Sequence, residues 1–370
     1  MTYPYSLSSP GGGTLGCIEI ARRLEEKGVD LVLVPVERDG SREQVTGLSD
    51  VRPVRPSKVH SLLDAAPVFR RVFHAVRETP TDLIIGWLHE AALIPFLARE
   101  GGPSFAMIAA MPSYKRWFGR TTGLRGLKRI PDTFWRMRPL RRAKLVFALS
   151  QFTKDELMST VGVDPARVIV AYWGVDSSFG QIQRQHSTTV RRFIFYGSLD
   201  PVKGVYDALE VMRRLGARGV SNFTLRIAGW GDEAAVRDRI KAHALENVVT
   251  FLGRLDHSDL RDELKRADLA ILPSRSESFG LSIAEAQASG LPVVSYETGA
   301  VPEVVENGKT GWLVPANDIE LLTEAVIQAM DHPHRALQMG LRARERIYTR
   351  FSWDRTASVI LEALQRVQSR

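Results

Sequence analysis

The sequence has little of what would anchor or cross-link a protein. Its 370 residues include one cysteine, Cys17, which excludes a disulfide within the chain and fits a reducing compartment. No apolar run approaches the roughly 20 residues that span a bilayer, and the start, MTYPYSLSSPGGG, lacks the parts of a secretion signal. The eight histidines are scattered and no Asp-x-Asp motif occurs. We therefore expect a cytoplasmic protein without a metal site.

Length and composition favour an ordinary soluble protein with two domains. A single hydrophobic core stops growing at about 250 residues, and this chain is longer. The composition, 44% hydrophobic and 25% charged, excludes disordered and fibrous classes.

Short runs rich in Val, Ile, Leu and Phe recur along the chain, with helical stretches between them. Such runs predict buried strands of parallel sheets that are covered on both faces. The runs lie at residues 31–36, 83–88, 104–109, 145–149 and 168–172, and then at 193–197, 223–228, 248–252, 269–272 and 292–295. The polar stretch 176–192 separates the two series and is interpreted as a linker. Two α/β domains are therefore predicted, and residues 353–367 predict a closing helix.

Two helix starts can be placed more closely. A glycine turn, GGG at residues 11–13, precedes a helix that begins near Thr14, and a doubly wound domain needs a buried strand before such a turn. Either residues 2–7 form a shortened strand or the natural protein begins upstream, which is our expectation. Farther along, apolar residues at helical spacing follow Asn317, which we expect to cap that helix.

The stretch 270–314 has the features of a ligand site. A strand at 269–272 leads into a loop with Glu277, and a helix opens at about Ser282 with Glu285 in its first turn. The loop lies where ligands bind in open α/β folds. The free amides at residues 279–283 suit a phosphate group, because they point out of a helix N-terminus.

The residues from Glu277 to Val314 resemble a known family. Glu277 and Glu285 form an E-x7-E pair within ESFGLSIAEAQASGLPVVSYETGAVPEVVENGKTGWLV, and this is similar to the retaining glycosyltransferases of family 4. The resemblance implies the GT-B fold: two Rossmann-like, doubly wound domains that face a central cleft. It implies an acceptor-side domain at 1–175, the linker 176–192, a nucleotide-sugar domain at 193–350, and a helix at 351–370 that crosses back to the first domain.

The resemblance also implies roles for three charged residues. Glu285 matches the glutamate that accepts hydrogen bonds from the ribose hydroxyls; a capping box formed by Ser282 and Glu285 is the alternative. Glu277 matches the glutamate beside the donor sugar, or is a solvated loop acid. Lys203, in FYGSLDPVKGV, matches the lysine that contacts the donor phosphates, or is a surface lysine.

Several glycines and backbone amides match the rest of the family's donor site. Plain turn chemistry is the alternative for the glycines. The matching residues are Gly12 and Gly13 near the phosphates and sugar, Gly229 and Gly231 beneath the nucleotide, and Phe279, Gly280 and Leu281 at the helix N-terminus.

The chain departs from the family at two places. Ser198 stands where the family usually has an arginine that binds phosphate, and Arg254 either compensates or is a plain surface residue. The family's usual histidine after the strand 104–109 is absent, since Met111 lies there. His89 is the nearest candidate for that catalytic role, with a structural histidine as the alternative.

The implied reaction transfers a hexose from a nucleoside diphosphate sugar to a hydroxyl acceptor with retained configuration. No cofactor and no protein nucleophile are expected. The resemblance suggests a part in the synthesis of cell-surface polysaccharide, lipopolysaccharide or glycolipid. A catalytically silent GT-B binding subunit, a GT-B epimerase and a phosphorylase remain as alternatives.

The positive charge of the chain is concentrated in one segment. Residues 113–144 hold eleven Lys or Arg and one acid, Asp132, so their net charge is +10, whereas the whole chain has +8 and the remainder −2. Aromatic residues lie between the cations. This pattern predicts contact with an anionic surface on the inner face of the cell membrane or with a lipid-linked acceptor. A soluble anionic acceptor or partner and a solvated loop are the alternatives; nucleic acid is not expected, because no binding module accompanies the charge.

Overall fold

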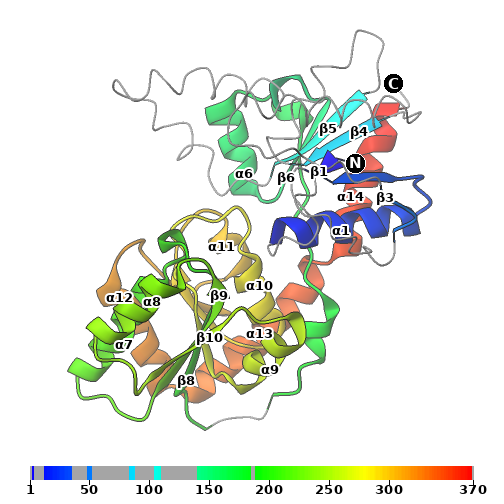
Figure 1. Ribbon diagram of the computed structural model, residues 1–370. Helices are drawn as coiled ribbons and strands as arrows, with labels where there is room; N and C mark the ends of the chain where they lie inside the picture. The colour runs from blue at the N-terminus through cyan, green and yellow to red at the C-terminus, as the bar shows by residue number, and fades with distance from the viewer. Residues whose placement is uncertain are drawn as a thin grey trace. The chain divides into compact units, whose positions relative to one another are not determined.

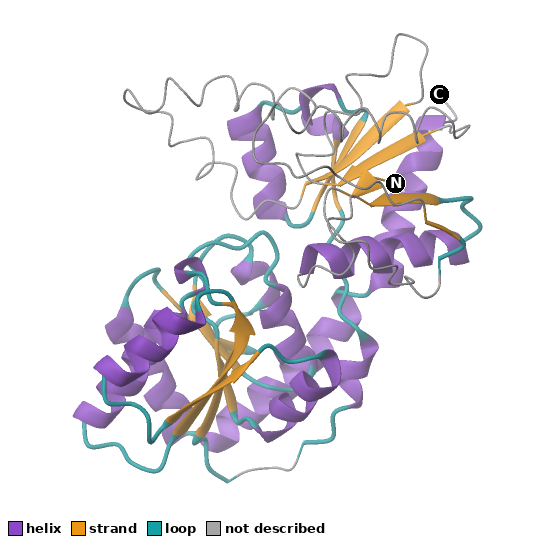
Figure 2. Ribbon diagram, viewed as in Figure 1, coloured by secondary structure: helices purple, strands orange, loops and turns teal. Residues whose placement is uncertain are grey.

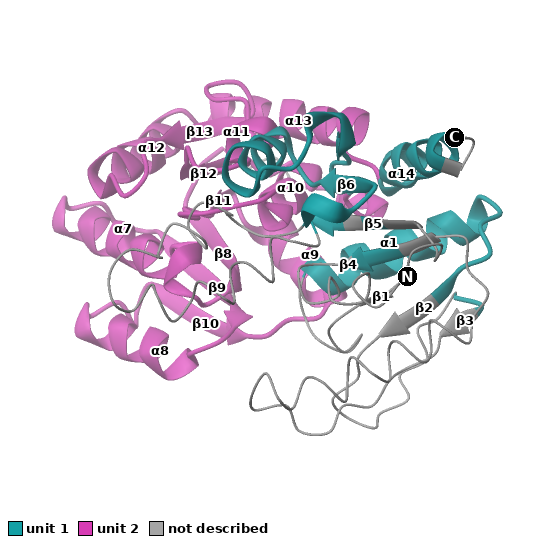
Figure 3. Ribbon diagram, turned by 90° about the horizontal axis from the view of Figure 1, so that it is seen from above, with its two compact units in different colours: residues 1–174, 353–370 teal, residues 175–352 magenta. Residues whose placement is uncertain are grey.

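The structure is a computed structural model of the chain. It describes residues 2–3, 12–35, 48–51, 83–87, 104–109, 140–184 and 188–368. The chain divides into two compact units, which Figure 3 distinguishes by colour. Unit 1 comprises Met1–Gly174 and Trp353–Arg370, and unit 2 comprises Val175–Ser352.

Unit 1 contains a parallel sheet with the strand order β3-β2-β1-β4-β5-β6-β7. The order changes direction between β1 and β4, as in doubly wound folds. The central strand β1 is described at Thr2–Tyr3, within the stretch 2–7 that was weighed as a shortened strand. The other strands are β2 Val32–Pro35, β3 Asp50–Val51, β4 Leu83–Trp87, β5 Ser104–Ala109, β6 Leu145–Ala148 and β7 Val168–Val170. All five strands predicted for this half of the chain are present.

The described helices of unit 1 come from the start, the middle and the end of the chain. Helix α1 packs against the last helix, α14, although the two are far apart in the chain. Ser150 caps α6 by accepting a hydrogen bond from the amide of Thr153 at 3.0 Å. The described elements are α1 Gly12–Glu26, α6 Gln151–Glu156, the π-helix Leu157–Val161, the 3₁₀ helix Pro165–Arg167 and α14 Trp353–Gln368.

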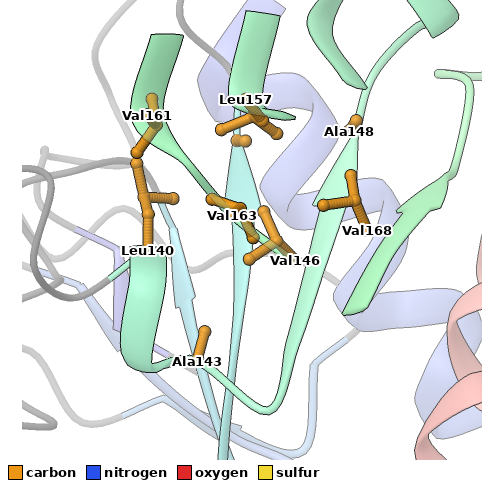
Figure 4. Packing of buried hydrophobic residues seen from close by; sticks show 9 residues of the cluster. Leu140, Ala143, Val146, Ala148, Leu157, Val161, Val163 and Val168 are labelled. Atoms are coloured by element: carbon orange, nitrogen blue, oxygen red, sulfur yellow. The ribbon is translucent and has the colours of Figure 1, made fainter. Parts of the chain in front are cut away.

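Part of the core of unit 1 lies around β6. Val146 and Ala148 of that strand point toward Leu157 and Val163, which follow α6 in the chain (Figure 4). All these side chains are buried, as expected for a parallel strand covered on both faces.

Unit 2 contains a second parallel sheet, with the order β10-β9-β8-β11-β12-β13. This is the strand order of a Rossmann-like domain, and its direction changes between β8 and β11. Its strands are β8 Arg192–Ser198, β9 Thr224–Trp230, β10 Val249–Gly253, β11 Leu269–Ile271, β12 Val293–Tyr296 and β13 Gly311–Val314. The first five were predicted. β13 was not, although its residues end the family motif.

Helices cover both faces of the second sheet. Figure 1 shows α7, α8 and α12 on one face and α9, α10 and α13 on the other, and Figure 2 shows the resulting layers. The helices are α7 Val205–Ala217, α8 Glu233–Ala242, α9 His257–Arg266, α10 Leu281–Ala288, α11 Val301–Val304, α12 Ile319–Asp331 and α13 Pro333–Arg350. None of the helices described in either unit is long and apolar enough to cross a bilayer.

The sequence predicts a linker at residues 176–192. In the structure this segment belongs to unit 2. Its 3₁₀ helix Ser177–Gln181 places Phe179 in the core, with its ring 4.9 Å from that of His257. Arg184 donates to the carbonyl oxygen of Leu264 at 2.6 Å, at the end of α9. The chain passes between the units at residues 174–175 and 352–353 instead.

Two predicted helix starts differ from the structure by one or two residues. Asp318, not Asn317, caps α12, because its carboxylate accepts from the amide of Leu321 at 2.9 Å; Asn317 adopts a left-handed φ of 65°. Helix α1 begins at Gly12 and not near Thr14.

Candidate active site

The reversal of strand order between β8 and β11 places two predicted residues at one edge of the unit 2 sheet. The neighbouring strands β8 and β11 lead to α7 and α10, which lie on opposite faces (Figure 1). At such a point the loops diverge, and ligands bind at the carboxyl ends of the strands. Lys203 follows β8, in the 3₁₀ helix Pro201–Lys203, and Glu277 follows β11.

Lys203 and Glu277 form an ion pair at this edge. The Nζ atom of Lys203 lies 2.6 Å from Oε1 of Glu277. The carboxylate side chain is 7% exposed, whereas the lysine side chain is 31% exposed and can reach an incoming ligand. The structure thus brings together two of the three predicted catalytic residues. The third, His89, lies outside the described residues.

Local hydrogen bonds and a glycine fix the loop that carries Lys203. Asp200 accepts from the amide of Val202 at 2.8 Å and so caps the 3₁₀ helix. Gly204 follows with a left-handed φ of 80°, and a Cβ atom there would lie 2.1 Å from the carbonyl oxygen of Pro273. The Lys203 loop therefore packs directly on the chain that leads to Glu277.

We expect Gly204→Ala to destabilise the protein well beyond the effect of backbone strain alone. A left-handed alanine costs about 1–2 kcal/mol, and relieving the clash with Pro273 adds about 1–3 kcal/mol. Gly219→Ala is the matched control, because Gly219 has a φ of 75° and nothing within 4 Å of an added Cβ. Urea unfolding measures both free energies; equal losses in the two variants would contradict the close approach.

The loop after β12 holds the backbone of Glu277. The carbonyl oxygen of Glu277 accepts from the amide of Ala300 at 3.1 Å, and Thr298 donates its hydroxyl to the carbonyl oxygen of Ser274 at 2.7 Å. An added Cβ on Gly299 would lie 2.2 Å from the oxygen of Glu277. The acid therefore sits on a packed loop, which does not fit a loosely solvated loop residue.

The N-terminus of α10 lies next to Glu277 and has no side-chain cap. Gly280 is its N-cap, with a φ of 89°, and an added Cβ there would lie 3.9 Å from Cγ of Glu277. The first bond within the helix runs from the amide of Ala284 to the carbonyl oxygen of Gly280 at 2.9 Å. The amides of the three preceding residues have no acceptor within the helix, so an anion is favoured there.

This geometry corrects one alternative for Glu285. A capping box needs Ser282 at the N-cap, but the helix begins at Leu281 and Ser282 lies inside it. The side chain of Phe279 is not a ligand contact, because its buried ring packs edge-on against Phe351 with centroids 5.4 Å apart.

Glu285 lies one turn into α10 as a buried carboxyl group. Burial, and to a smaller extent the carboxylate of Asp176, raise the pKa of Glu285 to about 8. The side chain forms no ion pair with any residue in the described part of the chain. Glu285 is therefore mostly protonated at neutral pH and is available to a hydrogen-bonding ligand.

Comparison with known proteins identifies the family. The model described as "Glycosyltransferase Family 4" matches residues 10–179, and the model described as "Glycosyl transferases group 1" matches residues 180–346. The chain belongs to the family 4 glycosyltransferases.

Relatives in the family share part of the chain. Glycogen synthase from Mycobacterium tuberculosis is 33% identical over 221 residues, which cover 59% of this chain and 53% of that protein. A putative colanic acid biosynthesis glycosyltransferase, WcaL, from Salmonella typhimurium is 31% identical over 236 residues, which cover 61% and 58%. The chain thus spans somewhat more than half the length of these curated relatives.

Solved structures confirm the predicted GT-B fold. Sucrose-phosphate synthase from Thermosynechococcus elongatus superposes with a TM-score of 0.82 at 18% identity, covering 100% of this chain and 99% of that one. Anabaena Alr3699/HepE in complex with UDP-glucose gives 0.78 at 21% identity, covering 98% and 99%. At these identities the likeness concerns the fold alone.

Close packing explains why glycine occupies two positions that match the family's nucleotide turn. An added Cβ on Gly229 would lie 2.1 Å from the carbonyl oxygen of Gly197, and Gly231 has a φ of 142° against Leu199. Ser198, where the family has arginine, accepts from the amide of Asp200 at 3.3 Å and supports the turn. Their contact with a donor stays a prediction.

The remaining predicted residues belong to other described elements. Gly12 and Gly13 form the first turn of α1 in unit 1. Arg254 is exposed after β10 and makes no ion pair with another residue of the described chain. Of the described residues, none forms a group of three or more potential metal ligands.

A second ion pair beside the site was not predicted from the sequence. Arg275 and Asp207 form a bidentate pair, and the hydroxyl of Tyr296 also lies against Asp207. One signal was available: Arg275 precedes Glu277 by two residues, Asp207 follows Lys203 by four, and their charges are opposite.

Proposed function

We propose that this protein is a retaining hexosyltransferase that uses a nucleoside diphosphate sugar as donor. The observation that carries the proposal is the pair of Lys203 and Glu277 at the switch point of unit 2, next to the uncapped N-terminus of α10. An ammonium group and free amides together match a diphosphate, and Glu277, which is next to both, is the proposed contact for the sugar.

The proposed reaction needs no covalent intermediate with the protein. The bond between the anomeric carbon and the diphosphate oxygen breaks, and the acceptor oxygen bonds to the same carbon from the same face. The acceptor proton passes to the leaving phosphate. Lys203 exchanges Glu277 for the diphosphate and stabilises its growing charge together with the amides of α10, while Glu277 orients the sugar.

Related proteins support a nucleotide-sugar donor and a part in polysaccharide synthesis. Anabaena Alr3699/HepE has been crystallised with UDP and glucose and with UDP-glucose. Relatives are named as a glycogen synthase and a putative colanic acid biosynthesis enzyme. We infer a role for this chain in the synthesis of cell-surface polysaccharide, lipopolysaccharide or glycolipid.

A thermal-shift screen against UDP-, GDP- and ADP-sugars tests donor binding. A ligand that binds only the folded state stabilises it by about 2.7 kcal/mol at a hundredfold excess over Kd, which raises the melting temperature by several degrees. One nucleotide class should stabilise the protein clearly more than the others. No shift with any nucleotide sugar would contradict the proposal.

The charge of the segment 113–144 supports a second proposal, contact with an anionic membrane surface. Most of this segment lies outside the described residues. In its described part, Arg141, Arg142 and Lys144 are exposed, and Arg141 also donates to the carbonyl oxygen of Val161. Each cation near an anionic surface contributes about 1 kcal/mol, so four or five suffice for measurable binding.

Vesicle co-sedimentation tests this contact. We expect binding to anionic but not to neutral vesicles, and weaker binding as salt shortens the Debye length. Replacing Arg116, Arg120, Arg125, Lys128 and Arg129 with Gln should abolish it. The matched control replaces five exposed cations of unit 2 with Gln: Arg237, Lys241, Lys265, Arg335 and Arg342. Equal binding by both variants would exclude a specific role for the segment.

A further inference from the structure

The bidentate pair of Arg275 and Asp207 joins the two loops of the candidate active site. Nε of Arg275 lies 3.0 Å from Oδ2 of Asp207, and Nη2 lies 2.7 Å from Oδ1. Asp207 is in the first turn of α7, four residues after Lys203, and Arg275 is two residues before Glu277. The amide of Arg275 also donates to the carbonyl oxygen of Val202 at 2.8 Å. The loops are thus connected twice, by side chains and by backbone.

In the proposed reaction, this second connection holds the two loops together while a donor is bound. Lys203 and Glu277 hold each other only until a diphosphate takes the ammonium group, so their own pair cannot keep the two loops in register with a donor bound. The pair of Asp207 and Arg275 involves neither side chain and can persist throughout. A fork of two parallel hydrogen bonds fixes orientation as well as distance, which a single contact does not.

The surroundings of Asp207 favour one arrangement of this pair. The Asp207 side chain is 8% exposed, and the hydroxyl of Tyr296 donates to its Oδ2 at 3.2 Å. Burial, and next the charge of Asp207, raise the pKa of Tyr296, so that this hydroxyl keeps its proton. Asp207 is therefore held from two sides, by the core strand β12 and by the Glu277 loop.

We propose that Asp207 and Arg275 are positioning residues that keep Lys203 and Glu277 at the spacing that donor transfer requires. The inference rests on the proposed function. A purely structural ion pair would make the same contacts, and unit 2 offers one for comparison. Arg226 of β9 forms a bidentate pair with Glu263 of α9, with side chains 36% and 7% exposed against 38% and 8% here.

The experiment compares Arg275→Met with Arg226→Met, since each removes one guanidinium from a buried carboxylate that keeps a second partner, Tyr296 for Asp207 and Arg266 for Glu263. We expect both variants to lose melting temperature. Only Arg275→Met should lower kcat for donor cleavage, by about tenfold to a hundredfold, because a small displacement of catalytic groups has effects of that size. The donor KM should change less than kcat. The double variant Asp207→Asn with Arg275→Met removes the buried charge and should recover melting temperature without recovering kcat.

A second measurement does not depend on activity. Hydrogen exchange at the amides of residues 274–280 should become faster in Arg275→Met and stay unchanged in Arg226→Met. Unchanged exchange in Arg275→Met, or equal losses of kcat in the two single variants, would overturn the inference. If the parent protein cleaves no nucleotide sugar, the proposed function fails, while hydrogen exchange still decides whether Arg275 holds the loop.

Discussion

Lys203→Ala is expected to lower kcat for release of the nucleoside diphosphate by about 10²–10³. Removing one group that stabilises developing charge in a transition state has effects of this order. Lys203 is the described cation nearest to Glu277, and its side chain remains 31% exposed at the edge where the donor is proposed to bind. Lys203→Arg keeps the charge and should retain more activity than the alanine variant.

A matched control separates this effect from the loss of an ion pair as such. Lys309 pairs with Glu306 in unit 2 at 2.5 Å between Nζ and Oε1, outside the candidate active site. Lys309→Ala should leave kcat unchanged. Single-turnover kinetics with a saturating donor gives the rate of cleavage directly. If Lys203→Ala keeps the parent rate, then Lys203 does not stabilise the leaving diphosphate.

Glu285→Gln is expected to stabilise the protein at alkaline pH and to weaken donor binding. The folded-state pKa of Glu285 is about 8, above the ordinary value of 4.5, so the unfolded chain ionises first. This carboxyl group therefore destabilises the fold progressively as pH rises from about 4.5 to about 8. Each pKa unit corresponds to about 1.4 kcal/mol, so the full effect is a few kcal/mol.

Urea unfolding between pH 4.5 and pH 8.5 measures the stability effect. The parent should lose stability over this interval relative to Glu285→Gln, and the two should converge at pH 4.5. Glu306→Gln provides a flat control, because the hydrogen bond from Lys309 lowers the pKa of Glu306 and places the pH dependence of this residue below the measured interval. Parallel pH profiles for the parent and Glu285→Gln would contradict a raised pKa.

Calorimetry measures the effect on binding. If the ribose hydroxyls donate to Glu285, the carboxylate form is favoured in the complex, and donor binding at pH 7 should release most of a proton. Glu285→Gln should abolish this release and weaken binding by about 1.5–3 kcal/mol, the value of a hydrogen bond to a charged group. Unchanged donor affinity would leave Glu285 as a structural residue.

The sequence predicted most of the fold because buried parallel strands have a plain signature. Continuous apolar runs such as 193–197 need no knowledge of their neighbours to be recognised. The strands that it missed lack that signature. β3 is described at two residues, Asp50–Val51, and β13 begins with Gly311 at a close approach to the oxygen of Val293. Adjacent polar residues were also ambiguous as caps, as Asn317 and Asp318 show.

The candidate site was predicted residue by residue but not as a geometry. Lys203 and Glu277 are 74 positions apart, and their contact depends on β8 and β11 being neighbours, which the strand order alone decides. The protonation of Glu285 depends on how α10 is packed within unit 2, and the residue type gives no hint of it. Asp207 and Arg275 were missed because each resembles an ordinary surface charge until the two loops meet.

Release of nucleoside diphosphate from purified protein tests the central claim most directly. The parent is incubated with each of a set of UDP-, GDP- and ADP-sugars, with and without a mixture of hydroxyl acceptors, and the free diphosphate is quantified by chromatography. We expect release from the nucleotide class that stabilises the protein, an increase with acceptor, and a loss of about 10²–10³ in Lys203→Ala. Binding of a nucleotide sugar without any release would contradict a transferase and indicate a catalytically silent GT-B protein.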